Sequence, residues 1–389
     1  MCKVRLMKKR PEWITKLHAL WGQKNIIWLS GVRRAGKTSL CKQLHSATYF
    51  NCDLPSVQRT LADPEFFWNN YDGDQPIVMD EIHRIEDPSL VLKIAADEHP
   101  HLRIIATGSS SLHAVRKFRD TLTDRKRTLH LPPVLWRECC GAFETPNLDR
   151  RLLHGGLPSV LLAPTPDPAF FEDWIDSFYA RDIQDLFGIR NRTGFLTLLK
   201  LLCLRNGGQL SITDLAKESG LSRPTVMAHL DAMEIAHAII RLPPWHGGSH
   251  REIIRQPRVY AFDTGLVAHV KGFEKIREDD RGRLWENLVL DELRFNHPQQ
   301  NLHYWRDKNQ REIDFIIKQP GGRVDTIEAK ISPDRCDGKA LRAFRALYPN
   351  GRNFIACPHI QQPYTIRRGE LTLHVTNPSS ISEHLTRTQ

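Results

Sequence analysis

Eight residues near the start of the chain have the types and spacing of a loop that binds nucleotide phosphates. Residues 31–38 read Gly-Val-Arg-Arg-Ala-Gly-Lys-Thr and fit the pattern G-x-x-x-x-G-K-[ST]. In such a loop, backbone N–H groups approach phosphate oxygens, Lys37 adds positive charge at the β and γ phosphates, and Thr38 offers its hydroxyl to magnesium. ATP and magnesium are the cofactors that this chemistry requires. The expected nucleotide ligands are Gly31, Arg34, Ala35, Gly36, Lys37, Thr38 and Ser39.

Two carboxylates follow an apolar run further along the chain. Residues 76–81 read Pro-Ile-Val-Met-Asp-Glu, which indicates a buried strand that delivers acidic side chains to the sheet edge nearest the phosphates. We expect Asp80 to hold magnesium through water and Glu81 to orient and polarise the attacking water, because phosphoryl transfer depends mostly on positioning and electrostatics. Lys37 and Glu81 are therefore candidate catalytic residues, and Thr38 and Asp80 are candidate metal ligands.

Hydroxyl groups follow the next apolar strand, in the run Thr-Gly-Ser-Ser-Ser at residues 107–111. Thr107 is a candidate to sense the γ phosphate, whereas Ser110 and Ser111 are equally typical of a turn that caps the next helix. The stretch that follows is rich in arginine, and one of its arginines is a candidate finger that reaches a neighbouring subunit's nucleotide. These arginines are Arg116, Arg119, Arg125 and Arg127.

The elements around these residues predict an α/β domain with a parallel sheet. Residues 25–30 form an apolar strand that enters the phosphate loop, and residues 37–45 have the pattern of the helix that leaves it. Apolar strands alternate with helical stretches as far as about residue 135, which is typical of a parallel sheet covered on both faces. We therefore expect a basic arm and helix over residues 1–22 and a nucleotide domain over 23–138.

These motifs resemble those of prokaryotic AAA+ ATPases that continue into a domain of unknown function with a nuclease-like C-terminal fold. The resemblance covers nearly the whole chain and rests on residues 31–38, 80–82, 107–111, 131–133 and 155–158. In that family a Gly-Arg pair usually precedes the strand that ends in Leu-Pro, and here Asp124-Arg125 holds that place. The resemblance therefore implies that Arg125 is the arginine finger, although Asp124 departs from the family pattern.

The middle of the chain is expected to contain a helical lid and a winged helix. Residues 139–205 are helical and punctuated by prolines, which indicates a lid or connector. Within 206–280, Gly220 stops one helix and Ser222 caps a second, the spacing of a helix-turn-helix, and apolar strand material follows. In a DNA-binding version the groove would be faced by Arg223, Thr225 and His229. A packing or oligomerisation module is the equal alternative.

The last domain, over residues 281–376, offers a second chemistry. Its order of elements, α-β-β-β-α-β, resembles that of PD-(D/E)XK nucleases, with Asp314 on one strand and Glu328-Ala329-Lys330 on the next. Period-two strands place Glu328 and Lys330 on one face, where Asp314 would share a magnesium ion with Glu328. Lys330 would orient the attacking water, and Glu286 would reach in from the helix. The alternative is a nuclease core kept only to bind DNA. Residues 377–389 form a polar tail.

Composition favours a polyanionic partner. The 389 residues carry a net charge of +10 with a pI of about 9.3, which suits nucleic acid, although an anionic membrane surface would attract the same charge. No run reaches transmembrane length, no apolar segment follows the basic N-terminus, and the eight cysteines contain no C-x-x-C pair. We therefore expect a reduced, cytoplasmic protein without structural zinc.

Together these features predict a cytoplasmic AAA+ ATPase that assembles into a homo-oligomer, as a ring, because a single motor domain would take its arginine in trans. Its expected substrate is DNA, with branched DNA as a candidate, and no membrane is involved. Two alternatives stay open. One is an ATP-regulated, magnesium-dependent nuclease that uses Glu286, Asp314, Glu328 and Lys330, and the other is a nucleotide-driven signalling or assembly switch that binds protein.

Overall fold

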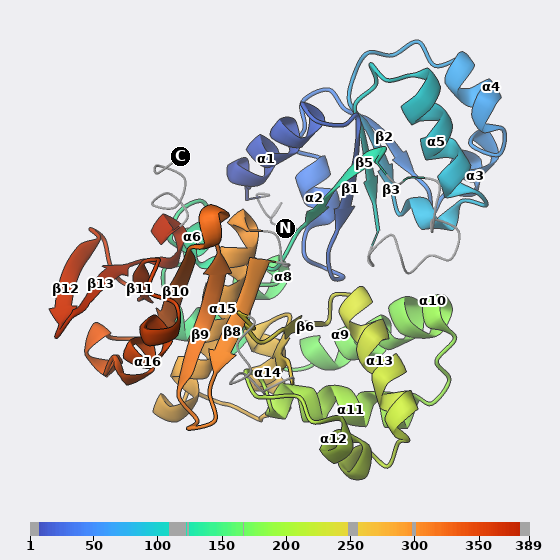
Figure 1. The fold of residues 1–389 in the computed structure, drawn as a ribbon. Helices are drawn as coiled ribbons and strands as arrows, with labels where there is room; N and C mark the ends of the chain where they lie inside the picture. The colour runs from blue at the N-terminus through green and yellow to red at the C-terminus, as the bar shows by residue number, and fades with distance from the viewer. Residues whose placement is uncertain are drawn as a thin grey trace.

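The computed structural model describes residues 8–108, 122, 124–165, 167–247, 256–297 and 301–381. The expected hydroxyl and arginine candidates Ser110, Ser111, Arg116 and Arg119 lie outside this range, as does most of the expected tail. Figure 1 shows three parts: an N-terminal sheet domain, a helical region in green and yellow, and a C-terminal sheet domain in orange and red. None of the described helices has the length and apolar character needed to cross a membrane.

The N-terminal domain is built on a parallel sheet of five strands in the order β2-β3-β4-β1-β5. The strands are β1 (Ile26–Ser30), β2 (Thr48–Asn51), β3 (Ile77–Asp80), β4 (Ile104–Thr107) and β5 (Lys126–His130). Neighbouring residues of β1 pack into different apolar clusters, Trp28 on one face of the sheet and Ile27 on the other. The predicted α/β domain with a parallel sheet covered on both faces is therefore confirmed.

Within the described residues, five α-helices flank this sheet. They are α1 (Pro11–Trp21), α2 (Lys37–Cys41), α3 (Pro55–Thr60), α4 (Pro64–Asn69) and α5 (Pro88–Glu98). Helix α1 packs against the sheet through Trp13 and Leu17. The Trp13 ring also meets the ring of Phe295 edge-on, with 4.8 Å between centroids, so α1 joins the N-terminal sheet to the C-terminal domain.

The helical region connects the two sheet domains. It contains α6 (Trp136–Cys140), α7 (Leu148–His154), α8 (Pro158–Leu161), α9 (Phe170–Phe178), a π-helix (Tyr179–Gln184), α10 (Asp185–Phe187), α11 (Arg192–Leu204) and α14 (Thr264–Val270). Helix α11 lies before the boundary expected at residue 205, yet it packs with α12, α14 and β7 of the following segment.

A helix pair and a two-stranded ribbon follow. Helices α12 (Ile212–Ser219) and α13 (Arg223–Ile235) are separated by Gly220, which has a positive φ of 68°, and Ser222 caps α13 by accepting from the Thr225 N–H. Strands β6 (Ile239–Leu242) and β7 (Arg258–Ala261) pair in antiparallel fashion, and Gln209 bridges to Arg258 beside them. Gly220 stops the first helix as the sequence pattern indicates.

The C-terminal domain has six strands in the order β12-β13-β11-β10-β9-β8. Helix α15 (Glu278–Asn296) comes first, followed by β8 (Leu302–Arg306), β9 (Glu312–Lys318), a 3₁₀ turn (Pro320–Gly322), β10 (Val324–Ala329), a second 3₁₀ turn (Pro333–Arg335), α16 (Lys339–Leu347) and β11 (Asn353–Ala356). Strands β12 (Tyr364–Arg368) and β13 (Leu371–Thr376) extend the sheet beyond the predicted order. Leu288 of α15 and Leu341 of α16 pack into separate apolar clusters, on opposite faces of the sheet.

Candidate functional site

The phosphate loop leaves the end of β1 in a conformation that needs its glycines. Gly31 has φ 151°, and a Cβ atom there would lie 2.3 Å from the carbonyl oxygen of Leu131. Gly36 has φ 98° and precedes α2. Side chains are strained at such positive φ angles. The two glycines therefore let the loop curve tightly and pass close to the segment that follows β5.

Lys37 points into the curve of this loop. Its Nζ donates to the carbonyl oxygens of Gly31 at 2.7 Å and Val32 at 3.2 Å. Burial lowers the pKa of Lys37, while the nearby carboxylates, Glu81 foremost, act in the opposite direction. The Lys37 ammonium group is thus held inside the curve of the phosphate loop.

Asp80 stands at the centre of a hydroxyl cluster at the end of β3. Its Oδ2 accepts from the Thr38 hydroxyl at 2.9 Å, and its Oδ1 accepts from the Thr107 hydroxyl at 2.5 Å. The Tyr49 hydroxyl also donates to Oδ2, a contact that no local pattern around Tyr49 indicates. Thr38 and Asp80 offer adjacent hard oxygen donors of the kind magnesium prefers, so these two residues fit the expected metal.

Glu81 follows in a strained conformation. Its φ of 54° is left-handed, a region that bulky residues adopt mainly where the surroundings impose it. Its N–H donates to the Thr107 hydroxyl at 3.0 Å, and its Oε2 lies 3.3 Å from Nδ1 of His83. Burial raises the pKa of Glu81. The Thr107 hydroxyl therefore holds the Asp80 carboxylate and the backbone of Glu81 in place.

Several of these residues line a cavity of about 750 Å³, within the usual size of a small-molecule site. Its polar side includes Lys37, Thr38 and Glu81, and its apolar side comes from the helical region. The apolar lining residues are Phe143, Pro158, Leu162 and Phe170. Lys8 and Arg10 of the N-terminal arm also line the cavity, and no motif around either residue predicts this position.

The variable residues of the phosphate loop are tied to the helical region. Nε of Arg33 donates to Oδ2 of Asp182 in the π-helix at 2.7 Å, and Trp174 donates to the Arg33 carbonyl at 3.2 Å. The Arg34 guanidinium lies 5.0 Å from the centre of the Phe170 ring. Ala35 and Gly36 complete the loop, Ser39 lies in the first turn of α2, and Gly36 and Ser39 line the cavity. The cavity is thus closed on one side by the same chain's helices.

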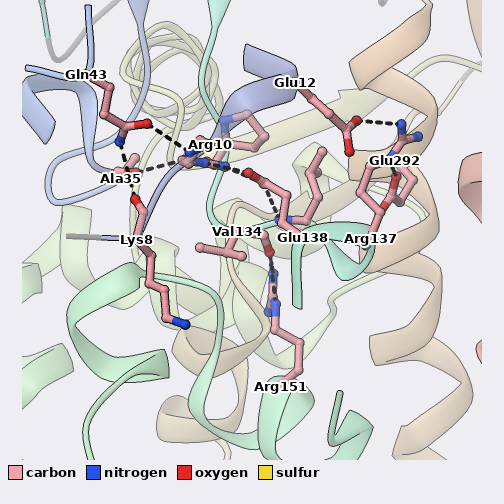
Figure 2. A network of polar contacts seen from close by, with 12 residues as sticks. Lys8, Arg10, Glu12, Ala35, Gln43, Val134, Arg137, Glu138, Arg151 and Glu292 are labelled. Atoms are coloured by element: carbon pink, nitrogen blue, oxygen red, sulfur yellow. Dashed lines mark hydrogen bonds and ion pairs between the residues drawn. The ribbon is translucent and has the colours of Figure 1, made fainter. Parts of the chain in front are cut away.

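Arg10 anchors the loop from the other side (Figure 2). Its guanidinium makes a two-pronged ion pair with Glu138 of α6, with N–O distances of 2.8 and 2.6 Å, and donates to the Ala35 carbonyl at 3.2 Å. Both charged side chains are almost fully buried, 3% and 5% exposed. Removing one partner of such a pair would leave an uncompensated buried charge.

The neighbouring residue on α6 contacts the C-terminal domain. Arg137 donates through its backbone N–H and its Nε to the carboxylate of Glu292 on α15, at 2.7 and 2.5 Å. Its Nη1 reaches Glu12 of α1 at 3.1 Å. Figure 2 shows both ion-pair systems side by side on α6. One short helix is therefore linked to the phosphate loop through the pair of Glu138 with Arg10, and it contacts the C-terminal domain through Arg137.

Arg125, the expected arginine finger, lies far from its own chain's phosphate loop. It precedes β5, whose first residue pairs with Ile26 at the start of β1, whereas the loop follows the other end of β1. Its Nε donates to Asp97 of α5 at 2.7 Å. Within this chain the side chain is therefore engaged in an ion pair at the opposite edge of the sheet.

The three expected DNA contacts on the helix pair have different surroundings. Arg223 is exposed at the start of α13, and Thr225 is half-buried and hydrogen-bonded to the Ser222 cap at 2.7 Å. His229 is only 4% exposed, and its ring packs 5.5 Å from that of Phe195. The expectation that His229 faces a DNA groove is wrong, because it shares the buried helix face with Val226 and Leu230.

The four expected nuclease residues come together in the C-terminal domain. Nζ of Lys330 lies 2.8 Å from Asp314 Oδ2 and 2.7 Å from Glu328 Oε2. Glu286 of α15 accepts a hydrogen bond from the Tyr260 hydroxyl at 3.3 Å. Burial raises the pKa of Glu286 to about 7 and that of Glu328 to about 8. Although burial opposes it, the charges of Lys330 and Arg258 hold the pKa of Asp314 below its ordinary value.

Magnesium does not fit this second cluster as expected. Across the described ranges, no group of three or more His, Cys, Asp or Glu side chains could hold a metal ion. The space between Asp314 and Glu328 is bridged by the Lys330 ammonium, and Arg258 of β7 faces the other side of Asp314 at 3.7 Å. The shared magnesium predicted for Asp314 and Glu328 is therefore corrected: cations of the chain itself take that position.

Comparison with known families gives three consecutive matches. Residues 23–140 match a family described as an AAA domain, residues 145–277 match a domain of unknown function (DUF8612), and residues 281–377 match another (DUF4143). Two uncharacterised proteins, from Mycobacterium bovis and Mycobacterium tuberculosis, are each 27% identical over 328 residues, which is 81% of this chain and 73% of theirs.

A solved structure with partial similarity is a signal transduction ATPase with numerous domains and a tetratricopeptide repeat sensor from Pyrococcus horikoshii. It is 14% identical, and the alignment covers 73% of this chain and 45% of that one with a TM-score of 0.28. That score is too low to establish a common architecture. The family match, the parallel sheet and the loop at its edge together support a P-loop domain of the AAA type over residues 23–140.

Proposed function

We propose that this protein is an ATP-hydrolysing enzyme that acts on DNA through the domains that follow its ATPase domain. The observation that carries the ATPase part is the convergence of Lys37, Thr38, Asp80 and Glu81 at the edge of one sheet, with Lys37, Thr38 and Glu81 lining one cavity of nucleotide size. Residues from separate elements meet there with the charges and hydroxyls that phosphoryl transfer needs.

Each residue of this site has a chemical role in the proposal. Lys37 exchanges its contacts with loop carbonyls for the β and γ phosphate oxygens. Thr38 and Asp80 would hold magnesium, which supplies positive charge to the phosphates. Glu81 orients the water whose oxygen bonds to the γ phosphorus as the bond to the leaving diphosphate oxygen breaks. Thr107 keeps the Asp80 carboxylate and the Glu81 backbone in position through its hydroxyl.

The DNA part of the proposal is supported by charge and by local architecture. The chain carries a net charge of +10, and Arg223 is exposed at the start of the second helix of the helix pair. A helix-turn-helix followed by an antiparallel ribbon has the order of a winged helix. The α-β-β-β-α-β order of the C-terminal domain resembles that of PD-(D/E)XK proteins. Assembly into a ring would bring Arg125 toward a neighbouring subunit's nucleotide.

The test uses purified protein with ATP, magnesium and an end-labelled four-way DNA junction at low salt, analysed on native and denaturing gels. We expect junction binding, ATP hydrolysis and separation of intact strands. Failure to bind DNA at low salt, where electrostatic attraction is strongest, would overturn the DNA part. Failure to hydrolyse ATP with or without DNA would overturn the ATPase part.

A magnesium-dependent nuclease is the second candidate, because Glu286, Asp314, Glu328 and Lys330 gather in one cluster. Shortened strands on the denaturing gel, lost in the Asp314→Asn variant, would support cleavage. We favour the first candidate because Lys330 and Arg258 already neutralise the carboxylates that a catalytic metal would need.

A further inference from the structure

A cationic side chain enters the C-terminal carboxylate cluster from outside the C-terminal domain. Arg258 belongs to β7 of the two-stranded ribbon, and its side chain is 5% exposed. Its Nη2 donates to Oε2 of Glu312 at 2.5 Å, and its guanidinium lies 4.9 Å from the centre of the Tyr304 ring. The ribbon thus contributes a buried positive charge to a site built by the following domain.

The other terminal nitrogen of Arg258 is the unusual one. Nη1 is buried but has no hydrogen-bond partner within the described part of the chain. It points between two carboxylates, 3.7 Å from Asp314 Oδ1 and 3.9 Å from Glu286 Oε2. A buried donor without a partner is rare and costly. Its position is explained by the charge of the carboxylates rather than by hydrogen bonding.

The oxygens that Arg258 faces are those that Lys330 leaves free. Lys330 binds Asp314 Oδ2 and Glu328 Oε2, and the Ala329 N–H also donates to Asp314 Oδ2 at 2.9 Å. Asp314 Oδ1 and Glu286 Oε2, which also accepts from the Tyr260 hydroxyl at 3.3 Å, both face Nη1. Magnesium or manganese binding these two oxygens at about 2 Å would lie against the guanidinium, and like charges that close repel strongly.

The backbone around Arg258 is fixed in this position. Arg258 pairs with Leu242 of β6 and bridges to Gln209 on its other side. The Tyr304 hydroxyl accepts from Gln209 Nε2 at 3.2 Å and donates to the Gln256 carbonyl at 2.5 Å. These contacts join the ribbon to β8, so the guanidinium is held over the cluster by the docking of two domains.

We propose that the Arg258 guanidinium takes the place of a divalent cation between Glu286 and Asp314, and that the C-terminal domain therefore contains a latent metal site closed by the preceding ribbon. The ligand of the opened site is a hard divalent cation such as Mn²⁺ or Mg²⁺. This inference goes beyond the proposed ATPase and DNA activities and requires neither.

The test is Mn²⁺ binding to nucleotide-free full-length protein, measured by loss of the free-ion electron paramagnetic resonance signal. All proteins carry Asp80→Asn, which removes the carboxylate of the other candidate metal site. The compared variants are the Asp80→Asn parent, Asp314→Asn, Arg258→Gln, Arg258→Lys, and Arg258→Gln with Asp314→Asn. Circular dichroism and thermal melting establish that each variant is folded.

We expect Arg258→Gln to bind one more Mn²⁺ per chain than the parent, because a repelling charge is gone. The affinity of this site for Mn²⁺ should be roughly tenfold or more higher in Arg258→Gln than in the parent. The added Asp314→Asn should abolish this site. Arg258→Lys should behave like the parent, because it keeps the positive charge. Mn²⁺ should also raise the melting temperature of Arg258→Gln and not that of the parent.

Two results would overturn the proposal. Mn²⁺ binding by the parent that disappears with Asp314→Asn would mean that Arg258 does not close the site, and this comparison needs no substitution at Arg258. A folded Arg258→Gln that binds no additional Mn²⁺ would mean that the carboxylates form no metal site at all. If Arg258→Gln does not fold, Arg258→Met, which keeps the aliphatic stem, takes its place in the same comparison.

Discussion

At the scale of the residue, Glu81 best distinguishes hydrolysis from binding. It lines the cavity with Lys37, has a left-handed backbone, and is fixed through its N–H to Thr107. Its carboxylate contacts no residue of the phosphate loop in the hydrogen bonds and ion pairs of the structure's described ranges, whereas Thr38 and Asp80 contact each other directly. Glu81 should therefore contribute to the reaction of water and little to the affinity for ATP.

We expect Glu81→Gln to bind ATP with wild-type affinity and to hydrolyse it at a rate lower by about 10²-fold or more, the range for losing a positioned acid–base group. Phosphate release measures the rate of hydrolysis, and titration with a fluorescent ATP analogue measures the affinity. Glu65→Gln, at an exposed site of α4, is the matched control. Hydrolysis that survives in Glu81→Gln would assign water activation to another residue.

The same carboxyl group sets an expected pH dependence. Burial raises the pKa of Glu81, and Arg33 lowers it; only the ionised carboxylate can polarise water. The value of kcat should therefore fall as pH decreases through a pKa above 4.5, the ordinary value. Arg33→Met should move this acid limb to higher pH, and Arg103→Met, at an exposed site, should leave it in place. Superimposable profiles of wild type and Arg33→Met would contradict the assignment.

At the scale of the element, α6 is the part of the structure on which both neighbouring domains depend. Arg10→Met leaves Glu138 buried without its partner, so we expect a loss of about 3–5 kcal/mol in the free energy of unfolding. The affinity for ATP should fall as well, because the Ala35 carbonyl loses its anchor. Urea unfolding and nucleotide titration measure these effects.

Two comparisons make this prediction specific. Arg10→Met combined with Glu138→Leu should recover much of the stability, since an apolar pair can replace a buried ion pair. Lys8→Met removes an ion pair with the exposed Glu144 and should leave stability unchanged. Equal effects of Arg10→Met and Lys8→Met would show that burial of the Arg10 pair is unimportant.

Elements with local patterns were predictable, and elements that depend on distant partners were not. The loop at 31–38 and the strand ending at Asp80 follow from glycine spacing and apolar runs. Strand β12 was missed because its residues are mostly exposed, and only pairing with β13 defines it. His229 was misplaced because the groove was assigned by position in the helix pair, although Val226, His229 and Met233 follow the spacing of a buried face.

The same limit applies to the sites. Lys37, Thr38 and Asp80 could be found because each lies within a recognisable motif. Tyr49 and Arg258 lie on strands that are distant in sequence from the residues they contact, Asp80 and Asp314. No pattern around Tyr49 or Arg258 indicates these partners. Contacts of this kind are products of the whole fold, so the sequence predicted the four acidic and basic residues of the C-terminal cluster and missed the arginine that closes it.

At the scale of the whole molecule, the positive charge should govern DNA affinity. Arg223 is exposed at the start of α13. Arg223→Ala should therefore weaken the binding of duplex DNA and reduce the slope of log K against log salt concentration by about one. Fluorescence anisotropy over a salt series measures both. Thr225→Val, which alters the half-buried neighbour without changing charge, is the control. An unchanged salt slope in Arg223→Ala would remove this helix from the DNA interface.

Communication between the domains should pass through Arg137. This side chain joins α6 to Glu292 of α15, and α15 also carries Glu286 of the carboxylate cluster. Because Arg10 links the neighbouring Glu138 to the phosphate loop, a nucleotide that fixes the loop should also reduce local opening of α15. We expect a non-hydrolysable ATP analogue to slow amide hydrogen exchange in α15 of the wild type.

Arg137→Met should abolish this slowing while nucleotide still protects the phosphate loop, because the contact with Glu292 is lost and the Arg10 pair is kept. Arg192→Met removes an exposed ion pair with Asp176 and should leave the response of α15 unchanged. If α15 is protected equally in Arg137→Met, the two domains communicate by another route. The packing of Trp13 against Phe295 would then be the contact to alter, since it connects α15 to α1, which packs on the sheet that carries the phosphate loop.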